Sequence, residues 1–276
     1  MIKVIDSYDS IKPMLGTPFV LQHWKEYACC ISASLPSKCL EDIADYDFDR
    51  QCVPVLNSAL MQAEGMETAH VNFELLIKNI NKRVEQCFSC EVEAEIIFYL
   101  GLCNGAGWAT QLDNKPTVLI GIEKVIELKW YDIRSMSGLV YHELGHLLHF
   151  QNRKQKSFAD TNQALWQLYT EGMAMFAEQE LMEDGNFFHQ DEGEWLLWCR
   201  DNRSSLFREY LRRVQARESV QDFFGDWCSY REHSDVGYYL GAVLVRSLSQ
   251  HMDFRQLCDC SAEQIKEQLC KLAEGE

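Results

Sequence analysis

The residues of this chain best suited to chemistry lie together in the pentapeptide His142-Glu143-Leu144-Gly145-His146, an HExxH pattern. On an α-helix, residues four apart lie about 40° apart around the axis and one turn along it. Both imidazoles therefore leave one face and can bind one metal ion, while Glu143, about 100° away, can activate a water. The pattern predicts one zinc ion per chain, with Glu143 as the general base of a zinc peptidase.

The residues around the pentapeptide predict a mostly buried helix. Ionisable side chains in such a helix are costly unless they are paired or bound to a metal, which favours a metal site. The alternative is a helix whose polar stripe only reaches solvent. The apolar residues of this segment are Leu139, Val140, Leu144, Leu147, Leu148 and Phe150.

A catalytic zinc needs a third protein ligand and one exchangeable position. The HExxHxxGxxH arrangement is excluded because His149 stands at its glycine position and Asn152 at its third histidine position. His149 lies about 20° from the stripe of His142, but a straight helix would have to span two turns to use it. We interpret His149 as a neighbour of the site, with ligation as the alternative.

A carboxylate from a separate helix is the other source of a third ligand. Asp160 and Thr161 predict an N-cap, and apolar residues then recur at helical spacing towards Asp184-Gly185. Glu171 lies among apolar neighbours on this helix, which suits a ligand better than a solvated charge. Glu178 shares its face and could hydrogen-bond a ligating histidine, although a surface carboxylate is an equal interpretation.

The segment Tyr169-Thr170-Glu171-Gly172-Met173-Ala174, followed by Glu178, resembles the Asn-Glu-Gly-Phe-Ala … Glu segment of M1-type aminopeptidases in the gluzincin clan. In those enzymes this segment carries the third zinc ligand, so the resemblance implies that role for Glu171. The layout is closer still to small zinc proteases known as DUF2268-like proteins, and the resemblance covers residues 100–245. It implies a zincin-like catalytic core. Thr170 departs from the pattern, since it replaces the asparagine.

The segment Val236–Leu244 is similar to the Pro-Tyr-Glu-Lys-Gly segment of M1-type enzymes, in which a tyrosine three residues before the glycine stabilises the oxyanion. The match implies this role for Tyr238. A phenol can donate a hydrogen bond to a developing alkoxide without carrying a charge itself. His233 and Tyr239 are the alternatives because either could present a donor from the same turn. Simple packing at the start of a helix is also possible.

Composition narrows the class of protein and its partners. The net charge of −16 repels phosphate backbones and anionic membranes, so we expect a peptide or protein substrate and neither nucleic acid nor membrane as a partner. No signal-peptide h-region and no membrane-spanning apolar run is evident, which predicts a cytoplasmic protein. The twelve cysteines are scattered and are expected to be buried, reduced thiols. Cys87 and Cys90 form a lone CxxC without the second pair of comparable spacing that a structural zinc requires, and the spacing of Cys258 and Cys260 is one residue too short for the usual zinc knuckle.

The predicted fold class is α+β and mainly helical, with a small mixed sheet before the HExxH helix. A helical N-terminal cap over residues 1–90 is expected to precede a catalytic region over residues 91–276, with Trp24 and Tyr27 in the core. One long helix is expected through residues 196–214, and Ser261 is expected to cap a final short helix. Strands are predicted at Ile2–Ile5, Val92–Leu100, Gly105–Gln111 and Thr117–Ile122, with a turn at Asp113–Pro116.

The glycine-rich start of the third predicted strand is a candidate for substrate binding. In zincins an edge strand pairs with the extended substrate backbone, and Gly105, Ala106 and Gly107 would allow a close approach of that backbone. A bulge or turn at these glycines is nearly as good an interpretation. Two other functions remain compatible with the sequence: a non-catalytic metal-binding or interaction protein on a peptidase scaffold, and a zinc hydrolase of a non-peptide substrate.

Overall fold

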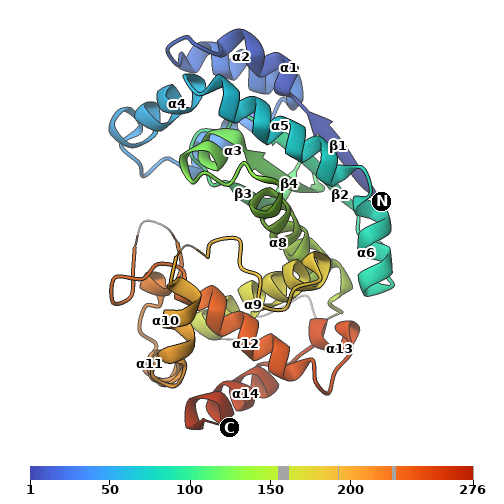
Figure 1. Ribbon diagram of the computed structural model, residues 1–276, viewed down its shortest axis with the longest axis vertical. Coiled ribbons are helices and arrows are strands. Elements are labelled where there is room, and N and C mark those ends of the chain that lie inside the picture. The colour runs from blue at the N-terminus through green and yellow to red at the C-terminus, as the bar shows by residue number, and fades with distance from the viewer. Residues whose placement is uncertain (155–161, 192, 226–227, 276) are drawn as a thin grey trace. The chain divides into compact units, whose positions relative to one another are not determined.

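The structure is a computed structural model that describes residues 1–154, 162–191, 193–225 and 228–275. The chain divides into two compact units, Met1–Leu147 and Leu148–Glu276, and the boundary falls inside one long helix, α8 (Ile133–Asn152). The described residues are mainly helical with one small mixed sheet, which confirms the predicted fold class at this level (Figure 1). The expected division of roles between residues 1–90 and 91–276 stays a prediction.

The sheet of the N-terminal unit has four strands in the order β1-β2-β4-β3. β1 and β2 are parallel, β2 and β4 are parallel, and β3 runs antiparallel to β4 at one edge of the sheet. All four strands fall at the predicted places. Their bounds are β1 (Ile2–Asp6), β2 (Ala94–Tyr99), β3 (Gly107–Leu112) and β4 (Lys115–Gly121).

The hairpin between β3 and β4 is tighter than the sequence predicts. Only Asp113 and Asn114 form the turn, with φ of 50° and 60°, which is the two-residue turn that matches the twist of paired strands. Pro116 therefore lies inside β4 rather than in the turn, opposite Gln111. β3 begins at Gly107, two residues after the predicted start.

Helices pack on both faces of β2. Successive side chains of a strand point to opposite faces, so neighbouring residues of β2 contact different helices. Phe98 stacks on Phe73 of α5 at 4.6 Å between ring centroids. Tyr99, on the other face, has its hydroxyl 3.8 Å from the sulfur of Cys39 on α3. The helices of this unit before α8 are α1 (Tyr8–Ile11), α2 (Leu21–Ile31), α3 (Leu35–Asp42), α4 (Val53–Leu60), α5 (Ala63–Ile77), α6 (Ile80–Phe88) and α7 (Ile122–Glu127), with short 3-10 and π turns at Lys12–Met14 and Phe48–Cys52.

The predicted core positions of α2 are buried. Trp24 is fully buried and donates its indole N–H to the carbonyl of Leu100, and Tyr27 accepts the backbone N–H of the same residue. These bonds tie α2 to the residue that follows β2. None of the twelve cysteines, all of which lie in the described residues, forms a disulfide. Five are buried, whereas three are exposed, contrary to the expectation of buried thiols. The buried ones are Cys39, Cys52, Cys199, Cys258 and Cys260, and the exposed ones are Cys29, Cys30 and Cys87.

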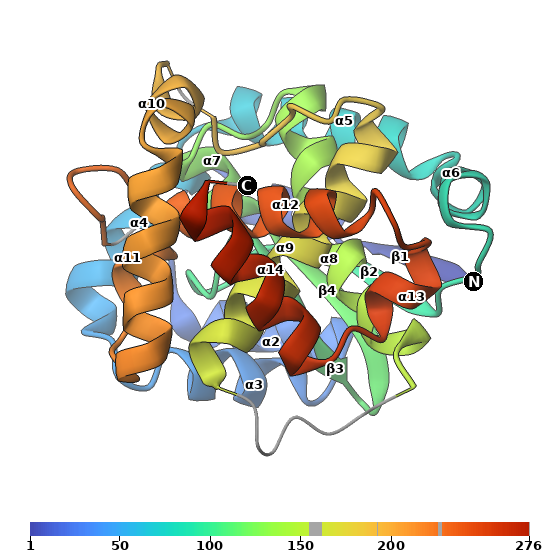
Figure 2. The ribbon, with the colours of Figure 1, turned by 90° about the horizontal axis from the view of Figure 1, so that it is seen from below.

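The C-terminal unit is built from helices. α9 packs against α12 and α14, and α11 packs against α14 (Figure 2). Asn162 caps α9 by accepting the N–H of Leu165; the predicted caps Asp160 and Thr161 lie outside the described residues. The helices are α9 (Gln163–Met182), α10 (Trp195–Asp201), α11 (Arg203–Ala216), α12 (Val236–Leu248), α13 (Phe254–Cys258) and α14 (Ala262–Glu274), with a 3-10 turn at Gln221–Phe223.

Two sequence expectations for this unit have different outcomes. Ser261 caps α14 in a reciprocal capping box with Gln264, as predicted. The prediction of a single long helix through residues 196–214 is wrong, because α10 and α11 separate at Asn202. At this point the Trp198 carbonyl accepts both the backbone N–H and the side-chain amide of Asn202, so the side chain adds a local bond at the end of α10. In the described part of the chain, no helix has both the length and the apolar character needed to cross a membrane.

Candidate metal centre

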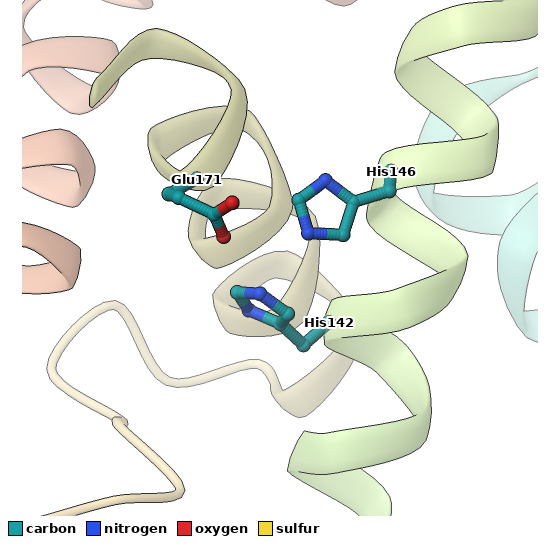
Figure 3. Close-up of side chains that lie close together, drawn as sticks. All are labelled: His142, His146 and Glu171. Carbon is teal, nitrogen blue, oxygen red and sulfur yellow. The ribbon is translucent and has the colours of Figure 1, made fainter. Parts of the chain in front are cut away.

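Three side chains with metal-binding atoms come together in the structure. His142, His146 and Glu171 each offer one ligand atom, and these atoms lie within 4.8 Å of one another. Figure 3 shows the Glu171 carboxylate facing the two imidazole rings. The ring centroids of His142 and His146 are 5.0 Å apart and the rings are nearly perpendicular, at 84°. Two imidazoles and one carboxylate are a donor set that can bind a metal ion.

The surroundings of these side chains fit a bound cation. His142 is 3% exposed, and His146 and Glu171 are half-buried. Partial removal of these donors from water strengthens the attraction between the carboxylate and a cation. α8 begins at a strong cap, since Asp132 accepts the N–H groups of Arg134 and Ser135, so its start is fixed by a local signal.

Glu143 is held against the edge of the sheet. It is 9% exposed, and its Oε2 accepts the backbone N–H of Ala109 on β3 at 2.7 Å. The approach is possible because residue 107 is glycine: a Cβ at Gly107 would lie 2.6 Å from both Cγ and Oε1 of Glu143. The absence of a side chain at Gly107 therefore allows the Glu143 carboxylate to lie close to β3.

The backbone of β3 alternates between the sheet and the open edge. Gly121 donates its N–H to the carbonyl of Ala106, so residue 106 and every second residue after it face β4. Gly107, Ala109 and Gln111 therefore direct their backbone groups to the open edge. Of the three residues predicted to bind substrate, only Gly107 has this orientation, because Ala106 faces β4 and Gly105 lies before the strand with φ of 144°.

Glu171 lies at a close crossing of two helices. A Cβ at Gly172 would lie 2.3 Å from the carbonyl oxygen of Gly241 on α12, and a Cβ at Gly241 would lie 2.8 Å from the Cα of Gly172. The two backbones can touch only because both residues are glycine. Thr170, which departs from the aminopeptidase pattern, bonds its hydroxyl to carbonyls of its own helix, those of Trp166 and Gln167.

Glu178 is fully buried and lies against His189, a histidine that no sequence pattern selects. Its carboxylate oxygens lie 3.0 and 2.9 Å from Nδ1 of His189, and one of them accepts the His189 backbone N–H at 3.0 Å. His142, Glu178 and His189 form a second group whose ligand atoms lie within 4.8 Å of one another. His189 stands in the connection after α9, where no motif or helical periodicity marks it.

The predicted alternates occupy other surroundings. His149 is fully buried among aromatic rings, with centroids of Trp166 and Tyr169 at 5.5 and 5.1 Å, and it belongs to neither group of metal-binding atoms. His233 stacks on Trp198 at 3.7 Å, and its Nδ1 lies 2.9 Å from the carbonyl oxygen of Arg231.

The two tyrosines at the start of α12 differ in exposure. Tyr238 is half-buried, with its ring edge-on to Phe224 at 5.5 Å. Tyr239 is 5% exposed, and burial raises the pKa of its phenol above the ordinary value. Tyr238 is therefore the more accessible of the two phenols.

Comparisons with known proteins assign no family to the chain. No family model, no curated protein and no solved structure matches it. A functional conclusion therefore depends on the residues of the candidate metal centre and on their geometry.

Proposed function

We propose that this chain is a zinc-dependent peptidase with a zincin-like core of the gluzincin type, in which His142, His146 and Glu171 hold one zinc ion. The observation that supports it is the convergence of their three ligand atoms within 4.8 Å, with Glu143 next to the first of them in the chain. Three protein ligands from nitrogen and oxygen donors are the number that catalytic zinc sites use, with the remaining position left to water or substrate.

Glu143 is the general base of the proposed reaction. When bound, zinc supplies Lewis acidity, which acidifies a water and polarises the scissile carbonyl. Glu143 takes the proton of the attacking water and passes it to the leaving amine. The Ala109 N–H fixes Oε2 of this carboxylate, and Oε1 remains to carry the proton.

Two further elements complete the proposal. Tyr238 donates its phenol hydrogen to the carbonyl oxygen as negative charge develops there. The outward backbone groups of Gly107 and Gln111 on β3 pair with an extended peptide in the manner of an added strand. This arrangement gives a peptide or protein substrate a defined register without reading its side chains.

Metal content and peptide hydrolysis, measured on the same variants, test the proposal. The wild-type chain is expected to bind about one zinc and to cleave members of a fluorogenic peptide library, and a chelator is expected to stop cleavage. Glu143→Gln should retain zinc and lose activity by about 10²–10⁴-fold, the usual contribution of a general base. His142→Ala and Glu171→Ala should lose zinc, whereas His251→Ala, which alters an exposed histidine outside the donor groups, should not.

The other outcomes of this experiment contradict particular parts of the proposal. Undiminished zinc in Glu171→Ala removes Glu171 as a ligand, and undiminished hydrolysis in Glu143→Gln removes the base. Zinc binding without cleavage of any peptide would indicate a non-catalytic metal-binding protein. Chelator-sensitive hydrolysis of esters but not of peptides would indicate a zinc hydrolase with another substrate.

A further inference from the structure

A second feature of the chain is a basic cavity within the C-terminal unit. The cavity has a volume of about 470 Å³ and is lined from α9, α10, α11 and α12 and from the connection after α9. Three arginines, Arg200, Arg203 and Arg246, are among its lining residues, and none of the lining side chains is a carboxylate. The net charge of the chain is −16, so this local concentration of positive charge is opposite in sign to the charge of the whole molecule.

The three guanidinium groups are paired to different extents. Arg246 is anchored: it donates to Glu180 and Gln179, lies 4.8 Å from the ring centroid of Phe176, and keeps a buried Nε with no hydrogen-bond partner among the described residues. Arg200 donates to the neutral side chain of Asn186 at 2.7 Å. Neither Arg200 nor Arg203 forms an ion pair with any residue in the described ranges.

The rest of the lining combines neutral hydrogen-bonding groups with an apolar wall. Tyr239 and Ser247 bring hydroxyl groups, while Phe188, Leu196 and Val243 bring hydrocarbon surface. The cavity therefore combines three guanidinium groups with neutral hydrogen-bonding groups and a partly apolar wall, and it has no carboxylate in its lining. A ligand suited to it carries negative oxygen atoms at one end and a compact carbon skeleton at the other.

We propose that this cavity binds a small organic oxyanion, with Arg200 and Arg203 holding its charged oxygens and Phe188 and Leu196 contacting its carbon skeleton. A planar guanidinium can form two parallel hydrogen bonds to a phosphate or a carboxylate, so both groups share the required chemistry. Arg200 and Arg203 are themselves exposed, and the alternative is that they only offset the acidic surface, in which case they would bind anions no better than other exposed arginines. The proposal does not depend on the metal centre.

Binding of defined probes to the purified full chain distinguishes these interpretations. Inorganic phosphate, phenyl phosphate and benzoate are titrated by calorimetry and by thermal unfolding, with sodium chloride at matched ionic strength as the reference. We expect saturable binding and stabilisation by phenyl phosphate or benzoate, tighter than by inorganic phosphate because the ring adds apolar contact. The aromatic probe that binds more tightly identifies phosphate or carboxylate as the preferred group.

Two arginine variants locate the site. Arg203→Ala should weaken the binding of the preferred probe by about tenfold or more, and Arg203→Lys should recover part of the loss because it restores charge but not the two-pronged contact. Arg212→Ala is the matched control, since Arg212 is an exposed arginine of the same helix already paired with Glu209 and Glu218. Equal losses in Arg203→Ala and Arg212→Ala, or effects no larger than those of sodium chloride, would overturn the proposal.

Discussion

Two regions of the N-terminal unit place a buried helical carboxylate against backbone N–H groups, with different consequences. α7 presents Glu123, whose two oxygens accept the N–H groups of Gly101 at 2.7 Å and Cys103 at 3.0 Å. α8 presents Glu143, which accepts one N–H, that of Ala109. Glu123 has no exposed surface, whereas Glu143 is 9% exposed and lies at the open edge of the sheet.

Both carboxylates rely on a neighbouring glycine. A Cβ at Gly101 would lie 2.5 Å from Oε1 of Glu123, and one at Gly107 would lie 2.6 Å from Oε1 of Glu143. Burial, backbone hydrogen bonds and a neighbouring glycine therefore do not by themselves identify a catalytic carboxylate. The distinction is that both oxygens of Glu123 accept backbone N–H groups in a closed interior, while Glu143 accepts one backbone N–H at the open edge of the sheet and directly follows His142 in the chain.

The largest expected difference between the two regions is in activity. Glu143→Gln should lower peptide hydrolysis by about 10²–10⁴-fold, while Glu123→Gln should leave the activity per folded chain within a few-fold of wild type. Both changes keep the size of the side chain. Initial rates normalised to the folded fraction from circular dichroism measure the contrast. Comparable losses in the two variants would contradict a special role for Glu143.

The spacing of residues predicted the two of the three donor residues that lie on one helix. His142 and His146 are four apart, and helical geometry alone places them on one side. Glu171 could be selected because a carboxylate stood among apolar residues in a helical pattern. Ala109 could not, since the group it contributes is a backbone N–H that every residue but proline possesses. His189 and Glu123 acquire their meaning only from partners brought near by the fold.

For the fold too, the elements with a regular sequence pattern could be predicted, whereas features that depend on a single contact could not. Strands and helices with strong periodicity, such as β2, α9 and α12, lie where the pattern of apolar residues places them. Errors occur where a single side chain or backbone angle decides. α10 and α11 separate at Asn202, whose side chain adds a bond to the carbonyl of Trp198, and Asp113 and Asn114 close the β3–β4 turn by adopting positive φ.

A second difference is in the pH dependence of stability. Burial raises the pKa of Glu123 from 4.5 to about 7, with the backbone N–H groups partly offsetting it. The folded state therefore holds this proton more tightly than the unfolded state, and the associated stability is complete below pH 4.5 and is lost as the pH rises through about 7. The shift corresponds to roughly 3 kcal/mol.

Urea denaturation at pH 5 and pH 8, with a chelator present in both, measures this effect. The free energy of unfolding of wild type should fall between these pH values by roughly 3 kcal/mol more than that of Glu123→Gln, which has no proton to lose. The comparison between the two proteins removes contributions from the other titrating groups. Parallel pH profiles would show that Glu123 keeps an ordinary pKa in the folded chain.

Substitution by alanine should change a different measured quantity at each glycine: the free energy of unfolding at Gly101 and kcat at Gly107. Gly101→Ala should lower the free energy of unfolding by roughly 1–3 kcal/mol, because its Cβ meets the Glu123 carboxylate and the Tyr99 hydroxyl in a closed interior. Gly107→Ala should displace Glu143 and lower kcat while zinc content stays near that of wild type. Denaturation, metal analysis and steady-state kinetics on both variants separate the effects. A loss of stability in Gly107→Ala equal to that in Gly101→Ala, with kcat unchanged, would argue against the distinction.

The smallest expected effect isolates the one hydrogen bond that holds Glu143. Ala109→Pro removes the N–H donor, and the open edge of a sheet is where proline is tolerated. Gln111→Pro is the matched control for kcat at saturating peptide, because its N–H also faces the open edge but does not reach Glu143; loss of its proposed contact with the substrate is expected to change KM. Loss of one hydrogen bond to a charged group should lower kcat roughly tenfold in Ala109→Pro relative to Gln111→Pro, with zinc content equal in both. Because the two prolines disturb the strand alike, a matching fall in kcat in both variants would trace the effect to β3 itself and remove Ala109 as a positioning residue.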